Sequence, residues 1–432
     1  KVKKNIFNII LILLMFSTHS AHSCSMYKIT IGDKTMVGYN EDAWRITPRI
    51  WFENPSKNGN YGAAFTGSRA IGNNQFAPQS GMNNVGLSFS RLVAHYPREV
   101  NNPIEKRKAI SSPSSYLKDI LHSCKTVKEV QQYIEEYDHS FFINDVFIYI
   151  DKSGDYLIVE PYSLKTGNNS YYVLSNFCPS ITNNEESRKL AKYRNGVDFL
   201  REHKLDTTLA FCTSLSDTMH VCRERNGDGT LLSSIWDLKE GVITLYFYHD
   251  YNYSIKYSLK EELMKGDHII KIPKLFPANS EFERLTNYIT PFKTHFIRIS
   301  LFFIGWFFFM TSLFFFMNFL FKKPLENNRH IKLYYPLLGI IMTYYMFVLA
   351  TNIGIYYINA PYHHYSDKII SLSSYIPFLL LMVIIPLFRY NFKVIKENSW
   401  NLISSFLFTE NNIIYSILLG AFIYWGLFSV FN

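Results

Sequence analysis

The chain lacks the charge pattern of a nucleic-acid-binding protein. Its 432 residues carry a net charge of +9, yet Lys and Arg are scattered and no arginine-rich stripe is present. A surface that binds the phosphate backbone concentrates basic side chains on one face or along one helix. The composition therefore excludes nucleic acid as the expected partner, and the basic excess fits loops that flank membrane segments.

Metal-binding motifs are also absent. The sequence has no Cys-x-x-Cys pair and no His-x-x-x-His spacing, which zinc sites commonly use. His363 and His364 stand as a lone pair in a short loop. We therefore expect no metal ion and no cofactor.

Cysteine is scarce and odd in number: the residues are Cys24, Cys124, Cys178, Cys212 and Cys222. In an exported chain an odd count indicates one thiol outside any disulfide. If Cys24 is that thiol, the other four either form two disulfides or are small buried side chains. Cys212 and Cys222 are close in sequence across a loop or hairpin and are the preferred pair.

Charged residues are fewer in the last third of the chain, where much of the 17% aromatic content gathers. Four apolar runs of about 20 residues or more lie there, at residues 299–321, 333–358, 369–388 and 412–431. Buried helices of a soluble domain would show a polar face, and these runs show none. We predict a membrane domain at 299–432 with four transmembrane helices. Because the centres of the runs lack Asp, Glu, Lys and Arg, a coupled pump is not expected.

Basic residues flank these runs unevenly. The loop after the first run holds Lys322, Lys323, Arg329 and Lys332, and the loop after the third holds Arg389, Lys393 and Lys396. The loop at 359–368 has one Lys. Since cytoplasmic loops are enriched in Lys and Arg, the first and third loops are predicted inside. The protein is then a multi-pass protein of the inner or plasma membrane, with residues before 299 on the periplasmic or extracellular side.

The N-terminus resembles a secretory signal peptide. A basic start at 1–4, an apolar run at 6–16 and Ala-His-Ser at 21–23 are typical of such a peptide over residues 1–23. Cleavage there would leave Cys24 first, with a thiol and a free α-amine. That amine has a pKa of roughly 7.7–8.0, so near neutral pH it can take a proton from its own side chain. A lipobox also ends in Cys, so lipidation is the alternative, although Ala21 stands where a lipobox favours Leu.

The segment after Cys24 has mixed α and β patterns. Alternating residues at 24–44 around Gly32-Asp33 predict a hairpin, and 230–248 predicts two more paired strands. Apolar residues at helical spacing predict helices at 112–122, 127–137 and 185–203. The pattern is that of an α+β domain with antiparallel sheets.

Five short motifs follow Cys24 in a fixed order. They are the hairpin that ends in Tyr-Asn-Glu-Asp at 39–42, Gly-Met-Asn-Asn-Val-Gly-Leu at 81–87, the strand pair at 147–160, Val-Leu-Ser-Asn at 173–176 and Ser-Arg at 187–188. This order resembles the N-terminal-nucleophile hydrolases of the choloylglycine hydrolase and penicillin-acyltransferase-like group, the linear amide C–N hydrolases. The resemblance covers about residues 24–265. It implies a four-layer αββα sandwich at 24–275, followed by a connector at 276–298.

The resemblance also implies site residues. Cys24 would be the nucleophile and Asp42 would orient its amine. The Asn176 side-chain amide and the Val93 backbone N–H would bind the oxyanion, and Arg188 would hold carboxylates of the site or the nucleophile loop. From the residues alone, Asp42 could equally be a turn cap, Asn176 a turn residue and Arg188 an exposed helix residue.

Two departures from the family pattern stand out, of which the first concerns an arginine that the bile-salt branch of the family uses near the thiol. The family's arginine after the hairpin glycine is Tyr39, and the glutamate of the Met-Asn-Glu turn is Asn84. Tyr39 and Asn83 are assigned to substrate binding, with turn formation as the alternative for Asn83.

The implied reaction is hydrolysis of a linear, non-peptide amide through an acyl-thioester. The substrate is a small molecule such as an N-acyl amine or a conjugated acid, and the membrane domain makes a lipid-like one plausible. An acyltransferase would use the same thioester. A non-catalytic ligand-binding or sensor domain on a membrane anchor is the third reading, and the oligomeric state stays open.

We predict that the mature chain starts at Cys24 with an unmodified α-amine, because residues 21–23 fit signal peptidase. Intact mass and N-terminal sequencing of the purified protein measure this directly. A chain that keeps Lys1, or a diacylglyceryl adduct on Cys24, would contradict the prediction.

Overall fold

The structure, a computed structural model, describes residues 24–43, 45–55, 59–72, 75–97, 107–222, 229–321, 331–357, 360 and 368–430. The predicted signal peptide at 1–23, and most of the first two loops used to predict membrane orientation, lie outside these residues. The chain divides into two units after Asn287. Each unit is described by itself.

The first hairpin forms the centre of a six-stranded sheet. β1 (Ser25–Ile31) pairs antiparallel with β2 (Lys34–Ala43), and Gly32 makes the turn at a φ of +59°, which glycine adopts without strain. The strand order is β12-β1-β2-β13-β14-β15. The remaining strands are β12 (Tyr171–Leu174), β13 (Gly229–Asp237), β14 (Val242–Phe247) and β15 (Asp250–Ser258).

A second, eight-stranded sheet has the order β11-β10-β9-β8-β7-β4-β3-β16, with every neighbouring pair antiparallel. Its strands are β3 (Arg49–Glu53), β4 (Ala63–Gly67), β7 (Ser80–Asn83), β8 (Ser88–Val93), β9 (Asp145–Ile150), β10 (Tyr156–Val159), β11 (Leu164–Gly167) and β16 (His268–Lys271). A separate small hairpin joins β5 (Arg69–Gly72) and β6 (Gln75–Ala77).

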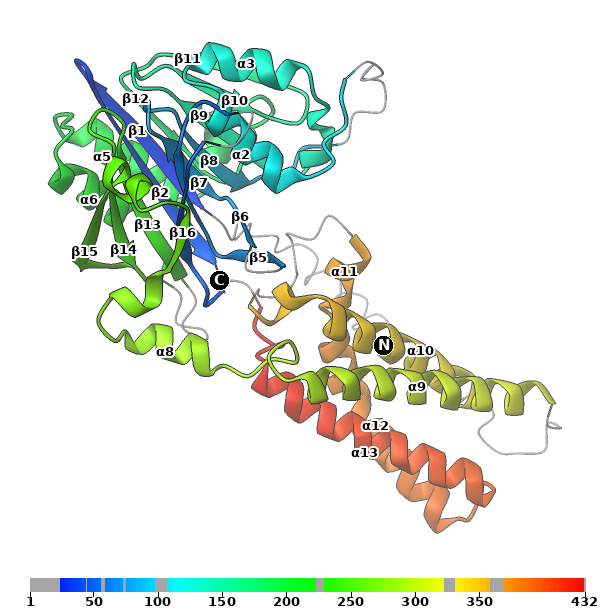
Figure 1. Cartoon of the computed structure of the whole chain (residues 1–432). Helices are drawn as coiled ribbons and strands as arrows, with labels where there is room; N and C mark the ends of the chain where they lie inside the picture. The colour runs from blue at the N-terminus through cyan, green and yellow to red at the C-terminus, as the bar shows by residue number, and fades with distance from the viewer. Residues whose placement is uncertain are drawn as a thin grey trace. The chain divides into compact units, whose positions relative to one another are not determined.

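Helices cover the outer face of each sheet (Figure 1). α2 (Pro113–Ser123) and α3 (Val127–Glu135) pack on the eight-stranded sheet, around Phe89 and Tyr149. α5 (Ala191–Glu202) and α6 (Leu209–Thr218) pack on the six-stranded sheet. Shorter helices are α4 (Asn184–Arg188), α7 (Leu259–Met264) and α8 (Ser280–Asn287).

Side chains between the two sheets join them directly. Lys28 of β1 donates to the carbonyl of Gly154 at 2.7 Å, and Tyr39 of β2 donates to the carbonyl of Arg91 in β8 at 2.8 Å. Both donors are buried, so these bonds satisfy polar groups that water cannot reach. The layers follow the order helices, sheet, sheet, helices, which confirms the predicted α+β class.

Two local expectations were wrong. The predicted helix at 185–203 is two helices, because Leu190 is extended with a ψ of 107° and ends the first of them. The stretch read as an aperiodic connector contains α8 and follows β16, an edge strand that pairs with β3. Its prolines, Pro277 and Pro291, had suggested the absence of regular structure.

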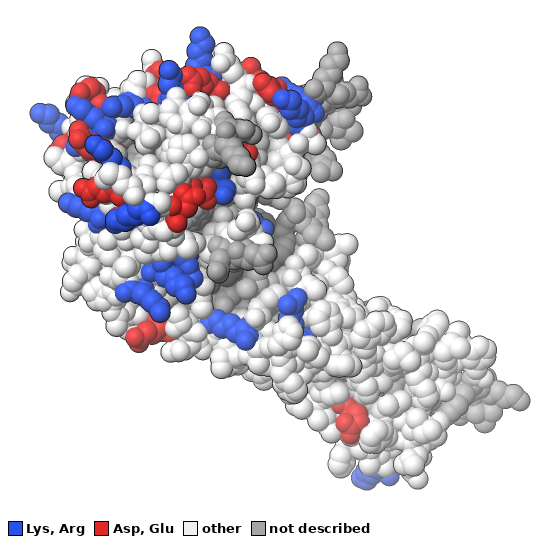
Figure 2. Space-filling view, viewed as in Figure 1, with Lys and Arg blue, Asp and Glu red and all other residues white. Residues whose placement is uncertain are grey.

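Among the described residues of the second unit, four helices are long and apolar enough to cross a membrane. They are α9 (His295–Phe321), α10 (Ile331–Thr351), α12 (Ile376–Lys396) and α13 (Leu402–Tyr424), and α11 (Lys368–Ser373) precedes α12. Charged side chains are sparse on the visible face of this unit, whereas they are scattered over the first unit (Figure 2).

The fourth apolar helix differs from its predicted range. It begins at Leu402, because the Asn401 side chain caps it by accepting from Ser404 N–H at 2.8 Å. Sequence reasoning began this span at 412, since polar residues are frequent between 402 and 411. The observed helix therefore includes Glu410, which the predicted span left out.

Candidate active site

Cys24 lies at the start of β1, where the six-stranded sheet brings several predicted site residues together. Met26 faces Leu174 of β12, so the same register carried back two residues places Asn176 opposite Cys24. On the other side, Ser25 faces Asn40, which places Glu41 of β2 opposite Cys24. The Ser175 hydroxyl donates to the Cys24 carbonyl at 3.3 Å and so holds the residue after β12 against the residue before β1.

The Cys24 side chain is buried, with 5% of the residue exposed. Burial raises the pKa of its thiol to about 11, and the carboxylates of Asp42 and Glu41 add to the rise. A hydrogen bond with the Tyr39 hydroxyl and the charge of Lys192 lower that pKa. The thiol is therefore protonated at neutral pH and needs a base to become a nucleophile.

Tyr39, which was assigned to substrate binding, lies beside the Cys24 thiol. Its hydroxyl donates to the Arg91 carbonyl at 2.8 Å beside the protonated thiol, and the same O–H can turn to donate to Cys24 Sγ when the thiolate forms, which lowers the thiol pKa. The Arg91 guanidinium is held by both oxygens of Asp145, at 2.8 and 2.9 Å. A tyrosine thus occupies the position at which the resembling family has an arginine, and it acts on the thiol by a hydrogen bond instead of a charge.

Asp42 is buried in an ion pair. Its Oδ2 lies 2.9 Å from Lys192 Nζ, with the two side chains 2% and 5% exposed, and its Oδ1 accepts from the Thr230 hydroxyl at 2.6 Å. The register that places Glu41 opposite Cys24 places Asp42 one step further, on the N-terminal side of Cys24. A carboxylate accepts up to about four hydrogen bonds, so Asp42 retains the capacity to accept from an α-ammonium group there.

Asn176 and Val93 are in contact. Asn176 Nδ2 donates to the Val93 carbonyl at 2.8 Å. Ala94 N–H donates across to Asn144, so the N–H and C=O of the neighbouring Val93 point the other way, toward Asn176. One N–H of the Asn176 amide is engaged, and the amide carries a second N–H.

Two predicted residues have other partners. Arg188 lies at the end of α4, and its Nη2 contacts both oxygens of Asp198 in α5 at 2.8 and 2.9 Å, so its contacts among the described residues are not with Cys24. Asn83 is 1% exposed and donates to the carbonyls of Leu121 and Cys124, each at 2.8 Å. Asn83 thereby fastens the β7–β8 turn to α2, which supports the reading of Asn83 as a turn former.

Sequence reasoning missed Lys192 and Glu41. Lys192 shares the buried stripe of α5 with Gly196 and Leu200, and this spacing of four is the signal that could have found it. Glu41 is 2% exposed; its Oε1 accepts from the Ser68 hydroxyl, and burial raises the pKa of its carboxyl.

The preferred disulfide between Cys212 and Cys222 is not formed. Cys212 is a fully buried free thiol of α6, in the core beside Tyr27 and Leu215. Cys222 is exposed, and its Sγ lies 3.5 Å from a carboxylate oxygen of Glu281. Closeness in sequence suggested the pair, but the helix turns Cys212 into the core.

Comparisons with known proteins place these observations beside solved structures. No protein-family model and no curated protein matches the chain. A mutant of conjugated bile acid hydrolase from Clostridium perfringens is 14% identical with a TM-score of 0.42, over 60% of this chain and 97% of that one. Penicillin V acylase from Agrobacterium tumefaciens is 14% identical with a TM-score of 0.43, over 57% and 90%.

A third similar structure is the Caenorhabditis elegans ortholog of N-acylethanolamine-hydrolyzing acid amidase. It is 14% identical with a TM-score of 0.35, over 50% of this chain and 92% of that one. These similarities agree with the resemblance predicted from the motifs. At such identities and TM-scores they say nothing about chemistry, so the proposed activity rests on the geometry around Cys24.

Asn83→Ala should destabilise the first unit by about 2–4 kcal/mol, because it leaves the buried carbonyls of Leu121 and Cys124 without their donor. Urea unfolding followed by tryptophan fluorescence measures the loss. Asn84→Ala, at the exposed neighbouring position, is the matched control and should leave the midpoint nearly unchanged. A stable Asn83→Ala protein with a raised KM would instead favour a role in substrate binding.

Tyr39→Phe should raise the pKa of the Cys24 thiol, because the hydrogen bond that favours the thiolate is lost. Less thiolate is then present at any given pH, and alkylation by iodoacetamide at pH 8 should slow by about 2- to 10-fold, the worth of one hydrogen bond of about 0.5–1.5 kcal/mol. Peptide mass spectrometry across pH follows Cys24, with Cys222 in the same sample as internal control. An unchanged or more acidic profile for Cys24 would contradict the role given to Tyr39.

Proposed function

We propose that the chain is a membrane-anchored amidohydrolase that uses an N-terminal cysteine to cleave a linear, non-peptide amide through an acyl-thioester. The proposal is supported by the register of β1, in which Asn176 and Asp42 fall next to Cys24, and by the hydrogen bond from Asn176 to Val93. A nucleophile, two donors for an oxyanion and a carboxylate beside the future amine are the parts that this chemistry needs.

Removal of residues 1–23 supplies the base. With the thiol pKa at about 11, roughly one molecule in ten thousand is a thiolate at pH 7. A free α-amine on Cys24 takes the thiol proton as Sγ attacks, because its own pKa is close to neutral. Asp42, whose charge Lys192 already balances in part, accepts hydrogen bonds from the resulting ammonium and keeps it beside the sulfur.

The reaction then follows in balanced steps. Sγ bonds to the amide carbon, and the carbonyl oxygen becomes an oxyanion held by the second N–H of Asn176 and the N–H of Val93. The C–N bond breaks, and the leaving amine takes the proton from the Cys24 ammonium. Water, deprotonated by the same α-amine, attacks the thioester, releases the carboxylic acid and restores the thiol.

The setting of the reaction is proposed from the second unit and the N-terminus. Four helices apolar enough to span a membrane would anchor the enzyme, and an N-terminal export signal would send the first unit to the periplasmic or extracellular side. A lipid-like N-acyl amide fits an enzyme held at the bilayer surface.

Cys24→Ala should abolish hydrolysis of an N-acyl amide, by several powers of ten, while Asn176→Ala should lower kcat by roughly 10²–10³ with little change in KM. Asn176→Asp should be at least as damaging, because it places a negative charge beside the oxyanion. Steady-state kinetics on a panel of N-acyl amides, with intact mass to detect an acyl adduct on Cys24, measure these effects.

Asn168→Ala, in an exposed turn, is the control for the Asn176 variants and should keep wild-type kcat. Activity of Cys24→Ala within about tenfold of wild type would remove Cys24 as nucleophile. Wild-type kcat in a folded Asn176→Ala protein would remove Asn176 from the oxyanion site.

A further inference from the structure

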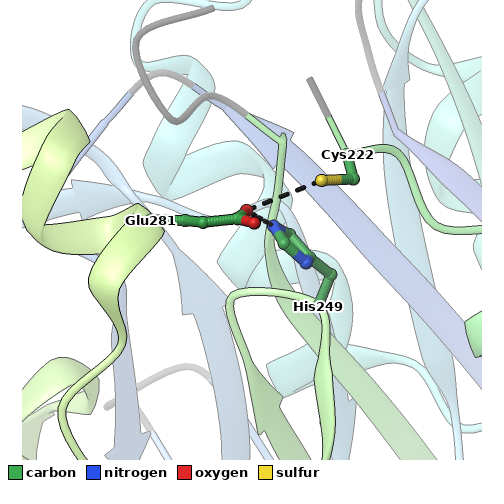
Figure 3. A group of neighbouring side chains, drawn as sticks. All are labelled: Cys222, His249 and Glu281. Carbon is green, nitrogen blue, oxygen red and sulfur yellow. Dashed lines mark hydrogen bonds and ion pairs between the residues drawn. The ribbon is translucent and has the colours of Figure 1, made fainter. Parts of the chain in front are cut away.

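Three metal-ligating side chains meet outside the site around Cys24. Cys222 lies just before β13, His249 sits in the turn between β14 and β15, and Glu281 is in the first turn of α8 (Figure 3). The sulfur, a ring nitrogen and a carboxylate oxygen all lie within 4.8 Å of one another. The three residues are far apart in the sequence, and the fold brings them to one place.

The distances between these atoms fit a tetrahedral metal ion. Glu281 Oε2 lies 3.1 Å from His249 Nε2 and 3.5 Å from Cys222 Sγ. A tetrahedral Zn²⁺ with bonds of about 2.0 Å to N and O and about 2.3 Å to S separates N from O by about 3.3 Å and S from O by about 3.5 Å. The two distances from Glu281 therefore match edges of a zinc tetrahedron, and the third, between Cys222 Sγ and the His249 ring, is within 4.8 Å.

The three side chains could instead lie close together because they form a network of hydrogen bonds. The environment of His249 is evidence against that explanation. Its Nε2 is buried and close to Glu281, yet it has no hydrogen-bond partner among the described residues. A buried nitrogen left unsatisfied costs about 1–3 kcal/mol. A cation held jointly by the nitrogen lone pair and the carboxylate removes that penalty without needing an N–H that points at the oxygen.

The surroundings hold the imidazole in place. Tyr248 and His249 have backbone φ angles of +54° and +46°, which residues other than glycine rarely adopt. Such strained backbone conformations cluster at functional sites. Gly229 makes room, because a Cβ there would lie 3.0 Å from His249 Cδ2. The His220 ring stacks on His249 with centroids 5.6 Å apart.

We propose that Cys222, His249 and Glu281 bind one divalent transition-metal ion, with Zn²⁺ as the best match, and leave a fourth position for water. A thiolate and an imidazole select borderline metals such as Zn²⁺ over Mg²⁺ and Ca²⁺, which prefer oxygen ligands alone. Cys222 is exposed and Glu281 is half-buried, so an ion can enter from solvent. This revises the expectation of no metal, which rested on the absence of close ligand spacings.

The bound ion would connect α8 to the six-stranded sheet. Gly229, which forms a bridge with Cys222, directly precedes Thr230, whose hydroxyl donates to Asp42. The metal site is thus next to the strand that supports the Asp42 carboxylate. Its binding does not depend on the proposed amidase activity, so the two proposals can fail separately.

The proposal is tested by measuring the zinc content of the full-length protein in detergent. The protein is first reduced with a phosphine and stripped of metal with a chelator, and is then loaded with Zn²⁺ and dialysed. We expect about one Zn²⁺ per chain, and at least tenfold weaker binding in Cys222→Ser, His249→Ala and Glu281→Gln, since each loses one of three protein ligands. His203→Ala and Glu283→Gln, at exposed positions, are matched controls that should bind as wild type does.

Cobalt provides a readout independent of stability. Co²⁺ added to the stripped protein should give a thiolate-to-cobalt charge-transfer band in wild type and in both controls, and none in Cys222→Ser. The proposal is overturned if wild type retains no more zinc than a variant that combines Cys222→Ser, His249→Ala and Glu281→Gln, or if Cys222→Ser alone keeps the cobalt band. Thermal unfolding of the metal-free proteins verifies that the variants are folded.

Discussion

The buried ion pair between Lys192 and Asp42 is the interaction on which the site around Cys24 depends. It joins α5 to β2, and the Thr230 hydroxyl ties β13 to the same carboxylate. Removing two charges from water is costly, and loss of one partner would leave the other uncompensated in the interior. The helix layer is therefore held against the sheet at the point where Asp42 lies beside the N-terminal side of Cys24.

Features set by local patterns could be predicted from sequence. The β1–β2 hairpin follows from alternation around Gly32, and α2 and α3 follow from apolar residues at helical spacing. Asn176 and Val93 were singled out only through the order of the motifs, and the hydrogen bond between them is seen only in the structure. Lys192 was missed because a lysine in an amphipathic helix is normally exposed, and only its place on the buried stripe marks it as an internal cation.

Residues that only the tertiary structure brings together could not be predicted from local sequence patterns. Cys222, His249 and Glu281 come from three elements with no recognisable spacing, and Cys212 was paired with Cys222 on sequence closeness alone. In the second unit, an apolar window placed the start of the fourth helix too late, because the first half of α13 contains polar residues that are buried inside the unit. Asn411, for example, accepts from the Thr311 hydroxyl of α9 at 3.2 Å.

The high pKa of the buried Cys24 thiol has a consequence for when the protein is active. Under the proposed mechanism, a chain that still carries residues 1–23 has a Cys24 thiol that stays protonated near neutral pH and no α-amine on Cys24 to deprotonate it. The newly made protein would be a latent precursor, harmless to amides in the compartment where it is synthesised. Cutting one peptide bond would then restrict hydrolysis to the side of the membrane where the leader is removed, without a separate inhibitor.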